Sequence, residues 1–256
     1  MVFIDSLDAV QTLANWQVLK KPCPPLLNPP FIIRLSGTKG LGMFASRPIA
    51  RGTLIMRERP VYVSQPNLCV FPDQKPFFYT SALAGLAPAA QAAIASLHNA
   101  QSETPDVGHV RGVVLTNALV AKIPHAPNTF PALFPHLCRA NHDCTPNAHY
   151  AFCMESFCGQ LFAVRGIAEG EEITIGYTDL TAKRAVRREN LEAKFRFVCK
   201  CKTCCLPQEQ ADRSDARREA MMEYFASMKK GERFPEGASL VRVKEMMHWA
   251  EEEGLV

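Results

Sequence analysis

The chain has 256 residues, a formal net charge of +4, 47% hydrophobic residues and 21% charged residues. This length can bury a sizeable core, and the composition is ordinary for a globular domain, which argues against a disordered or fibrous chain. No apolar run is long enough for a membrane span, the first residues lack the pattern of a secretory signal, and the mild charge indicates only a slightly basic surface without a nucleic-acid motif.

The N-terminal segment, residues 1–30, predicts a helix followed by a stiff linker. Apolar residues recur at helical spacing over 5–19, with Asp5 or Ser6 as the cap. The prolines of residues 21–30 permit neither a helix nor a strand ladder. We expect this segment to lie on the body of the molecule as a structural arm.

Short strand-like runs separated by turn-forming residues follow the arm, and they return later in the chain. Short strands at such close spacing indicate a twisted, mostly antiparallel sheet rather than parallel β-α-β units. The predicted strands are 31–35, 42–46, 53–57, 60–63, 148–153, 160–164 and 172–176.

Helical patterns occupy the middle and the end of the chain. Residues 64–130 change character and become rich in alanine and leucine. A later helix, 181–195, is densely charged, and we interpret its basic residues, Arg187 among them, as a solvated face. The predicted helices are 81–98, 107–123, 181–195, about 208–228 and about 238–252.

Ten cysteines are a high count for a chain without a secretory signal, and in a reducing compartment they favour metal ligands and buried thiols over disulfides. Cys199, Cys201 and Cys204 have the C-x-C-x-x-C spacing, which supplies three thiolates of a tetrahedral zinc site and requires a fourth ligand from elsewhere. Thiol redox chemistry is a weaker interpretation because the spacing suits zinc better. Small core residues or free thiols are expected at Cys23, Cys69, Cys138, Cys153, Cys158 and Cys205.

Four segments together carry a resemblance to a known family. They are KGLGMFA at 39–45, RANHDCTPN at 139–147, GEEITIGY at 170–177 and FVCKCKTC at 197–204. In this order they resemble the SET domain of protein-lysine methyltransferases, above all the SET-and-MYND subfamily and its fungal relatives without the MYND finger. The resemblance covers roughly residues 31–205. Only Cys69 lies between residues 24 and 137, too few thiols for the zinc-binding MYND finger.

The resemblance implies an α+β SET fold of short, mostly antiparallel strands with a knot-like C-terminal segment, a helical insert, a zinc-binding post-SET flap and short flanking helices. Accordingly, we predict a SET domain at 31–195 with its insert at about 64–130. A post-SET segment at 196–206 and C-terminal helices at 207–256 would complete the chain.

By the same resemblance, the first segment binds S-adenosylmethionine. Lys39, Gly40 and Leu41 would wrap the methionine part of this cofactor. Two glycines two residues apart let the backbone approach a ligand closely and offer it peptide groups. The family side chain at position 41 is often polar, so we expect Leu41 to contribute only its backbone.

Further cofactor contacts are implied at three positions, with two weaker candidates. The side chain of Asn141 would hold polar groups of the cofactor, and the main chain of His142 would contact the adenine, with the imidazole structural rather than a general base. Phe197 would stack on the adenine ring. Asn117 is a looser match for a cofactor contact, and Cys138 is a weaker candidate still.

The resemblance also assigns the catalytic residue and the last metal ligand. Tyr177 matches the family's catalytic tyrosine, whose phenol can hold the methyl group and the attacking, neutral lysine nitrogen in line. Cys144 would join Cys199, Cys201 and Cys204 as the fourth ligand of a structural Zn²⁺ ion.

Two residues depart from the family pattern. Asp143 stands where serine is common and places a carboxylate beside the predicted site. Phe195 stands where the subfamily often has tyrosine, so one phenolic hydroxyl is missing from the predicted lysine channel.

The leading interpretation is an S-adenosylmethionine-dependent protein-lysine N-methyltransferase that acts on a histone tail or another protein and releases S-adenosylhomocysteine. Two alternatives stay open: a SET scaffold that binds cofactor or a partner without methylating, and a SET enzyme repurposed for a small-molecule amine. We expect an intracellular protein, in the nucleus or the cytoplasm, that is monomeric by default.

Overall fold

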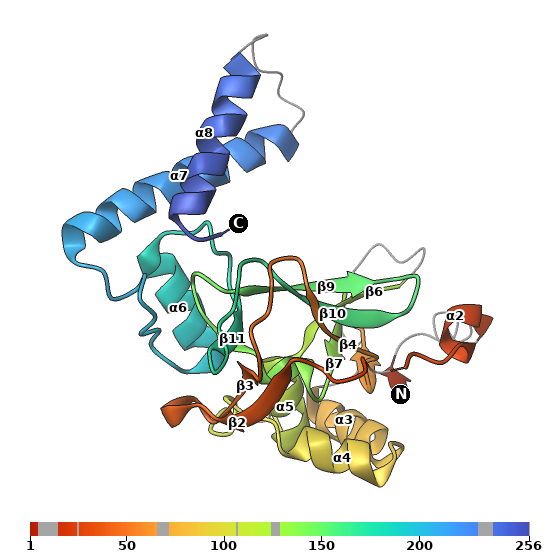
Figure 1. Ribbon diagram of the computed structural model, residues 1–256. Coiled ribbons are helices and arrows are strands. Elements are labelled where there is room, and N and C mark those ends of the chain that lie inside the picture. The colour runs from red at the N-terminus through yellow and green to blue at the C-terminus, as the bar shows by residue number, and fades with distance from the viewer. Residues whose placement is uncertain are drawn as a thin grey trace.

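A computed structural model describes residues 1–4, 15–24, 26–65, 72–105, 107–123, 129–229 and 238–255. Short strands form the body of the molecule, and helices cover it on two sides (Figure 1). The predicted α+β class with mostly antiparallel pairing is therefore confirmed. No described helix combines the length and the apolar character that a membrane span requires.

The described strands form three small sheets, in which β1–β5 and β8–β11 are parallel pairs and the other pairs are antiparallel. The first sheet has the order β2 (Phe31–Leu35), β3 (Leu41–Ala45), β11 (Glu172–Ile175) and β8 (Asn141–His142). The second has the order β4 (Leu54–Glu58), β10 (Cys158–Ala163) and β9 (Ala148–Cys153). The third has the order β1 (Val2–Ile4), β5 (Tyr62–Ser64), β7 (Thr129–Leu133) and β6 (Leu119–Lys122).

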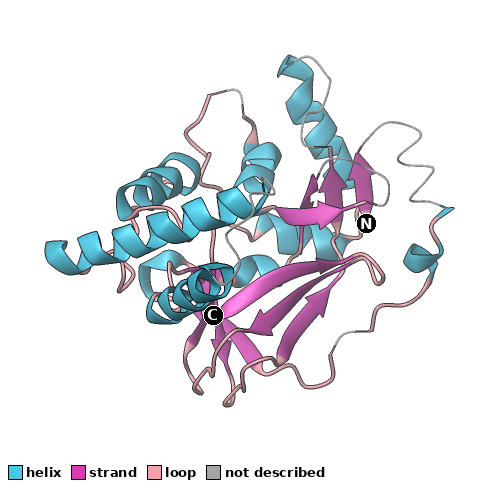
Figure 2. Cartoon of the chain, turned by 90° about the horizontal axis from the view of Figure 1, so that it is seen from above, coloured by secondary structure: helices cyan, strands magenta, loops and turns pink. Residues whose placement is uncertain are grey.

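The helices fall into two groups around these sheets (Figures 1 and 2). The insert contributes α3 (Lys75–Ala84), α4 (Pro88–Ala95) and α5 (His109–Asn117), which lie together beside the third sheet. The C-terminal part contributes α6 (Arg184–Phe195) and a helical hairpin of α7 (Gln208–Lys229) and α8 (Ala238–Glu252). The remaining helical turns are α2 (Gln17–Lys20), η1 (Gly37–Lys39), η2 (Pro72–Gln74) and η3 (Leu137–Arg139).

Strand β11 brings three of the sequence motifs side by side. It pairs with β3 on one edge and with β8 on the other, so that Thr174 lies opposite Asn141. The buried side chain of Asn147 fastens the motif around β8 to β11: its Oδ1 accepts a bond from the Thr174 amide at 2.9 Å, and its Nδ2 donates to the Glu172 carbonyl at 2.8 Å. Both ends of this polar side chain are therefore satisfied in the interior.

Two hydrophobic clusters hold the body together. The larger one joins the first two sheets and includes Met43, Ile55 and Ile173, each fully buried. The smaller one packs the third sheet against the insert helices through residues such as Tyr62 and Ile94. Burying a large apolar side chain contributes about 1.5–3 kcal/mol, so these clusters supply the main driving force for placing β11 between its neighbours.

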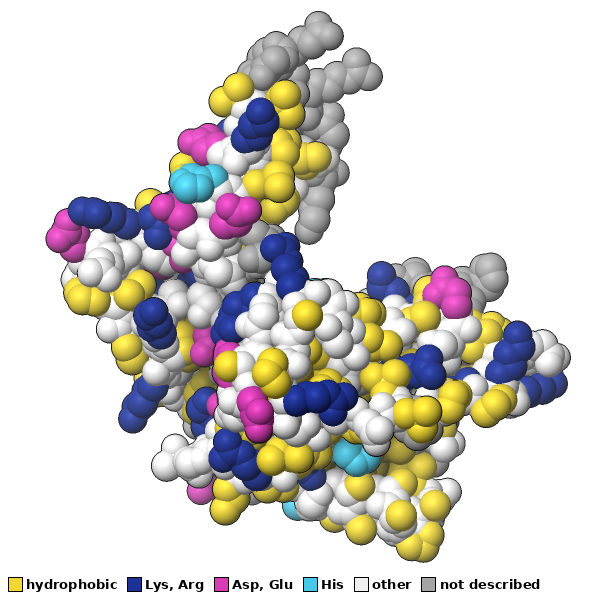
Figure 3. Space-filling view, in the orientation of Figure 1, with side chains coloured by type: hydrophobic (Ala, Val, Ile, Leu, Met, Phe, Trp, Pro, Cys, Tyr) yellow, Lys and Arg dark blue, Asp and Glu magenta, His cyan; other side chains and the backbone are white. Residues whose placement is uncertain are grey.

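Buried charges anchor the C-terminal hairpin to the body. Arg218 of α7 is fully buried, pairs with Glu253 at 2.9 Å and donates a hydrogen bond to the carbonyl of Leu180. Removing one partner of such a buried pair typically costs about 3–5 kcal/mol. Lysines and arginines are dispersed over the surface that Figure 3 shows. The hairpin also exposes hydrophobic side chains, which are those of Met222, Phe225, Met228, Leu240, Val241, Val243 and Met247.

Several predicted elements match the structure, and others need correction. Strands 31–35 and 148–153 are confirmed at their predicted bounds, and the two C-terminal helices are confirmed as α7 and α8. The single helix predicted over 81–98 is wrong. The chain instead forms α3 and α4, because Pro88 occupies the first turn of a new helix, where its fixed backbone angle and missing N–H are tolerated.

The helix predicted over 107–123 is also wrong in its second half. It ends at Asn117, and residues 119–122 form strand β6, because Val120 and Ala121 pair with β7, a strand that the sequence patterns missed. Of the predicted helix 5–19, residues 5–14 lie outside the described residues, and Trp16 is extended, so the helix is not continuous.

Candidate functional site

A carboxylate at the start of β11 binds two of the predicted cofactor residues. Glu172 Oε2 accepts a hydrogen bond from Lys39 Nζ at 2.9 Å, and its Oε1 accepts one from Asn141 Nδ2 at 2.8 Å. Burial acts to raise the pKa of Glu172, but the hydrogen bonds from Asn141 and Lys39 outweigh it and hold the pKa below its ordinary value. Glu172 is therefore charged at neutral pH and fixes both side chains.

Two glycines of the first motif serve this arrangement in different ways. Gly40 has a φ of +79°, a left-handed conformation that favours glycine. A Cβ atom at Gly42 would lie 2.6 Å from Glu172 Oε1 and 2.9 Å from Asn141 Nδ2, so only glycine leaves room for that pair. Between them, Leu41 is 39% exposed, and its carbonyl lies 3.4 Å from Asn141 Nδ2.

His142 lies buried between Tyr177 and the cysteines. The backbone amide of Tyr177 donates to Nδ1 at 3.1 Å, which places the ring proton on Nε2, 3.3 Å from Cys144 Sγ. Burial lowers the pKa of His142 to about 4, so the ring is neutral at pH 7. Both ring nitrogens are engaged, and neither is free to accept a proton from a substrate.

Aromatic rings continue from His142 toward the surface. Its ring centroid lies 5.4 Å from that of Tyr177 and 6.2 Å from that of Phe197. Phe197 is 36% exposed, so part of its ring remains available for stacking. The ring of Phe195 also packs against Tyr177, with centroids 4.8 Å apart, and lies 6.5 Å from that of Phe197.

Tyr177 also borders a cavity of about 380 Å³. Its walls come from distant parts of the chain, and among the described residues that line it there is no carboxylate. The Tyr177 hydroxyl donates to the Ala140 carbonyl at 2.8 Å, and burial raises the pKa of this phenol well above its ordinary value. The cavity is lined by residues 116–120, 138, 140, 146, 148–150, 175–178, 180, 194 and 195.

Asn117 lines this cavity, whereas Lys39 and Asn141 do not. Its Nδ2 atom donates to the carbonyls of His98 and Val113, both at 2.7 Å, so the amide nitrogen is committed to the backbone. The structure therefore brings the other predicted cofactor residues close to Glu172 and His142 and places Asn117 on the cavity side of Tyr177.

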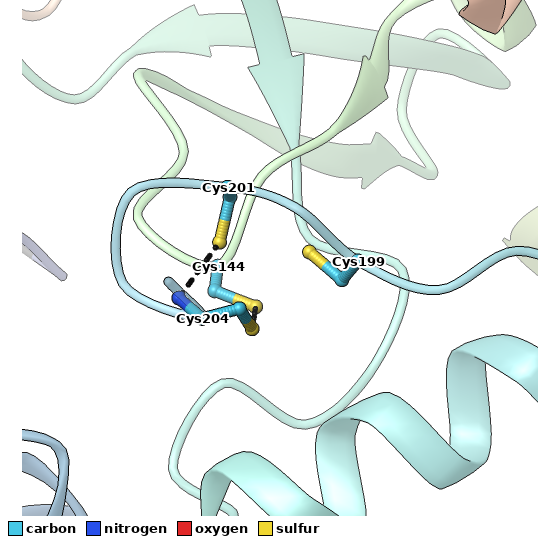
Figure 4. Close-up of side chains that lie close together, drawn as sticks. All are labelled: Cys144, Cys199, Cys201 and Cys204. Atoms are coloured by element: carbon cyan, nitrogen blue, oxygen red, sulfur yellow. Dashed lines mark hydrogen bonds between the residues drawn. The ribbon is translucent and has the colours of Figure 1, made fainter. Parts of the chain in front are cut away.

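Four sulfur atoms converge (Figure 4), and one of them, Cys144 Sγ, lies 3.3 Å from His142 Nε2. Those of Cys144, Cys199, Cys201 and Cys204 all lie within 4.8 Å of one another, which makes the group able to hold a metal ion. Cys144 follows β8, and the other three stand on the loop after α6, so the sulfurs join two distant segments. A tetrahedral zinc ion with Zn–S bonds of about 2.3 Å accepts four such thiolates.

A buried arginine tests whether this group suits a metal. Arg187 is fully buried, its Nε lies 3.3 Å from Cys144 Sγ, and its Nη2 has no hydrogen-bond partner among the described residues. Burial acts to lower the pKa of Arg187, but the charges of Cys144 and Cys204 outweigh it and raise that pKa. A buried cation requires a negative neighbour, and four thiolates on a divalent cation supply a net charge of about −2. The residues fit.

The interpretation of Arg187 as part of a solvated face is therefore wrong. Arg187 and Leu191 are the buried residues of α6, and they lie one helical turn apart on the same face. In the sequence, the four-residue spacing between Arg187 and Leu191 was the sign that Arg187 lies on the buried face of this helix.

A family model described as the SET domain matches residues 40–178, which is more than half of the chain. The chain belongs to the SET-domain family. The matched range contains β3, β8 and β11 with Lys39 just before it, and Cys199, Cys201 and Cys204 follow it.

This SET-domain chain is similar to methyltransferases from several organisms. The histone-lysine N-methyltransferase set5 of Schizosaccharomyces pombe is 30% identical over 216 residues, covering 84% of this chain and 63% of the relative. The human histone-lysine N-methyltransferase SMYD3 is 34% identical over 98 residues, 38% of this chain and 22% of the relative. The protein-lysine N-trimethyltransferase SMYD5 of Danio rerio is 36% identical over 75 residues. The chain spans less than two thirds of each relative.

The relatives support the resemblance to the SET-and-MYND subfamily and its fungal relatives, and no MYND finger is shown among the described residues. Within the described residues, the four-cysteine group is the single cluster of three or more potential metal ligands. Cys69, the one cysteine in the predicted insert, lies outside the described residues.

Asp143, a departure from the SET pattern, has a local structural role. Its Oδ1 accepts hydrogen bonds from the amide of Thr145 at 2.8 Å and from its hydroxyl at 3.0 Å. This turn shapes the loop that carries Cys144, and a serine hydroxyl can accept the same backbone bond. Asp143 thus gives no support to the idea of a SET scaffold that cannot methylate.

Glu172 is the polar residue of the SET site to which the motif pattern assigned no role. Its contacts become visible only once β11 is known to lie between β3 and β8. Sequence alone offered one signal, the acidic pair that precedes an apolar strand.

Proposed function

We propose that this SET-domain chain is an S-adenosylmethionine-dependent protein-lysine N-methyltransferase. The observation that carries the proposal is that Tyr177 lines a cavity without carboxylates among its described lining residues and also contacts His142, the neighbour of Asn141 in a polar site suited to a cofactor. The polar site contains Lys39 and Asn141, held by Glu172. The cavity has the volume to admit a long, thin side chain such as that of lysine.

The polar side of Tyr177 would bind the cofactor. Lys39 and the Gly40–Leu41 backbone contact its methionine part, Asn141 holds its polar groups, and the exposed face of Phe197 stacks on its adenine. When bound, S-adenosylmethionine supplies a methyl group on a sulfonium sulfur. The main chain of His142 contacts the adenine, while its imidazole supports Tyr177 and Cys144.

Tyr177 would orient the reacting amine rather than deprotonate it. Because burial raises the pKa of its phenol, the hydroxyl stays protonated at neutral pH and cannot serve as a strong base. The amine must lose its proton before attack, and a cavity without carboxylates among its described lining residues favours the neutral form. The phenol oxygen then holds the nitrogen in line with the transferred methyl group.

A structural zinc ion would fix the segment that closes the site. Cys144, Cys199, Cys201 and Cys204 are its ligands, and we assign residues 196–206 to a post-SET flap pinned onto a knot-like segment around β8. In this arrangement Phe197, two residues before Cys199, takes its position from the metal site.

The substrate class follows from the cavity and from the relatives. The names of set5 and SMYD3 describe histone-lysine methylation, and that of SMYD5 describes protein-lysine trimethylation. Apolar groups such as Phe195 and Leu180 line the cavity and suit the methylene chain of a lysine. We propose a protein lysine, of a histone or of another intracellular protein, as the methyl acceptor.

Transfer of labelled methyl groups tests this function. The zinc-loaded protein is incubated with labelled S-adenosylmethionine and, separately, with histones, whole-cell proteins and a panel of small amines. We expect label on lysine residues of proteins, identified by mass spectrometry of digested bands. Label only in the small amines, or none in any pool from a protein that binds the cofactor, contradicts the proposal.

A further inference from the structure

Outside the cysteine cluster, two more thiols meet in the body of the molecule. Cys23 belongs to the proline-rich arm, and Cys158 begins strand β10. Their sulfur atoms lie 2.7 Å apart. We propose that Cys23 and Cys158 form a reversible disulfide bond that fastens the N-terminal arm to the second sheet.

The sulfur separation is the first support for this bond. In the four-cysteine group, the Cys144 and Cys204 sulfurs lie 3.6 Å apart, which is suited to a shared metal ion. The Cys23 and Cys158 sulfurs are nearly an ångström closer and approach the length of a disulfide, about 2.05 Å. Bond formation therefore needs only a small movement of the side chains.

The backbone around Cys23 is already held in place on both sides. On the N-terminal side, Arg59 donates to the carbonyl of Val18 at 2.8 Å and to that of Ser156, beside Cys158, at 3.3 Å. On the C-terminal side, Arg57 donates to the carbonyl of Pro24 at 3.1 Å. Arg57 of β4 and Arg59 just after it thus hold the arm against the second sheet on both sides of Cys23.

Aromatic packing adds a third fixed point. The ring of Trp16 meets that of Phe157 edge-on, with centroids 5.4 Å apart, immediately before Cys158 in the chain. Phe157 is fully buried, so this contact ties the arm to the hydrophobic core rather than to the surface. The arm and the start of β10 therefore behave as one packed unit.

The accessibility of the two thiols sets the order of the chemistry. Cys23 is partly exposed and Cys158 is buried. The Cys23 thiolate attacks a low-molecular-weight disulfide such as oxidised glutathione, which breaks its S–S bond and releases one glutathione thiolate. Cys158 then loses its proton and attacks the Cys23 sulfur of the mixed disulfide, which releases the second glutathione. Two electrons and two protons pass from the cysteines to one glutathione disulfide.

Cys153 is the competing partner for Cys158. It stands directly opposite Cys158 in the register of β9 and β10, but its sulfur contacts Glu155 Oε2 at 3.3 Å. The geometry therefore selects Cys23 over the neighbour that strand pairing alone would favour. Formation of the Cys23–Cys158 bond in preference to Cys153–Cys158 is a specific consequence of where the arm lies.

Disulfide mapping tests the proposal without reference to methyl transfer. The full chain is incubated with oxidised glutathione, free thiols are blocked with N-ethylmaleimide, and the digest is analysed by mass spectrometry with and without reductant. We expect a linked peptide pair containing Cys23 and Cys158 that disappears on reduction. Alkylation of both thiols, a Cys153–Cys158 pair, or glutathione held on Cys23 without onward exchange overturns the proposal.

Two variants complete the test, and neither removes a buried residue. Cys23→Ser removes a thiol of the arm, and Cys153→Ser removes the competitor. We expect oxidation to raise the melting temperature by about 5–10 °C in the wild type and in Cys153→Ser, because the bond closes a long loop, and to leave Cys23→Ser unchanged. An equal rise in Cys23→Ser places the effect at other thiols and rejects the bond.

Discussion

Two regions near Tyr177 differ in character. On the polar side, next to His142, Glu172 binds Lys39 and Asn141 through its two carboxylate oxygens; the cavity that Tyr177 itself lines has no carboxylate among its described lining residues. The polar side is a network of hydrogen bonds to one charged carboxylate, all of them within the chain. The cavity is lined by apolar side chains such as Leu180 and Phe195 together with polar ones such as Thr178 and Lys194. Under the proposed function, such a division would keep a zwitterionic cofactor and a neutral amine apart except at the phenol of Tyr177.

Substitutions on the polar side and on the cavity side should affect different measured quantities. Loss of a charged hydrogen bond on the polar side should reduce affinity for the cofactor, because those bonds exist in the ground state. Changes on the cavity side should alter turnover and the number of methyl groups added, because that side positions the amine. The following variants separate the two effects, in order of decreasing size.

Tyr177→Phe should give the largest loss. We expect methyl transfer to fall by roughly 100-fold or more, because the phenol that aligns the amine is gone, while cofactor affinity changes less than about threefold. Tyr150→Phe is the matched control: Tyr150 lines the same cavity, and its hydroxyl donates to the Val120 carbonyl at 2.7 Å. Equal losses in both variants, measured with labelled cofactor, would show that Tyr177 has no special role.

Arg187→Met should weaken metal binding by the four-cysteine group. Removing the buried guanidinium leaves the thiolates without their positive neighbour, and we expect zinc affinity to fall by about 10–100-fold. Competition with a chromophoric chelator measures this change. Arg187→Lys should retain part of the zinc affinity. Arg213→Met, a control at an exposed position on α7, should leave the zinc affinity unchanged. Unchanged zinc affinity in Arg187→Met contradicts the proposed charge balance.

Glu172→Gln should weaken cofactor binding by about tenfold. The amide keeps the size of the carboxylate but loses the charge that holds Lys39 and Asn141. Calorimetric titration with S-adenosylhomocysteine measures the effect, and Glu169→Gln, an exposed neighbour, is the control. If both variants bind as tightly as the wild type, the carboxylate does not organise the site.

Phe195→Tyr should give the smallest change. The rings of Phe195 and Tyr177 are in contact, with centroids 4.8 Å apart. A hydroxyl added to residue 195 would take space that a methylated amine needs. We expect total turnover to change by less than about tenfold, with products shifted toward fewer methyl groups per lysine. Mass spectrometry of the methylated protein measures the distribution. An unchanged distribution would mean that Phe195 does not contact the methylated nitrogen.

The polar side was largely predictable from the sequence because its residues lie in short motifs. Lys39 and Asn141 stand in motifs that carry weight only together, as parts of the SET resemblance, and the cysteine spacing is the stronger signal; Glu172 joins the first two residues, and the four sulfurs converge. The sequence also shows that residue 172 is acidic. Its hydrogen-bond partners could not be predicted, because they depend on the order of the strands in the sheet, which motif spacing does not encode.

The cavity side was less predictable because it is assembled from distant segments. Residues near 117, 138, 150, 177 and 195 line it, and no local pattern links them. The two-residue strand β8 and the strand β6 depend on pairing with neighbours rather than on local preference. Arg187 was misjudged for a related reason, since its buried position depends on where the cysteine loop folds back.

Equilibrium binding of S-adenosylmethionine and S-adenosylhomocysteine to the zinc-loaded protein tests the central claim most directly. If the network around Glu172 is a cofactor site, both ligands bind with one-to-one stoichiometry to the wild type and to Tyr177→Phe, and about tenfold more weakly to Glu172→Gln. A folded, metal-loaded protein that binds neither ligand contradicts the account.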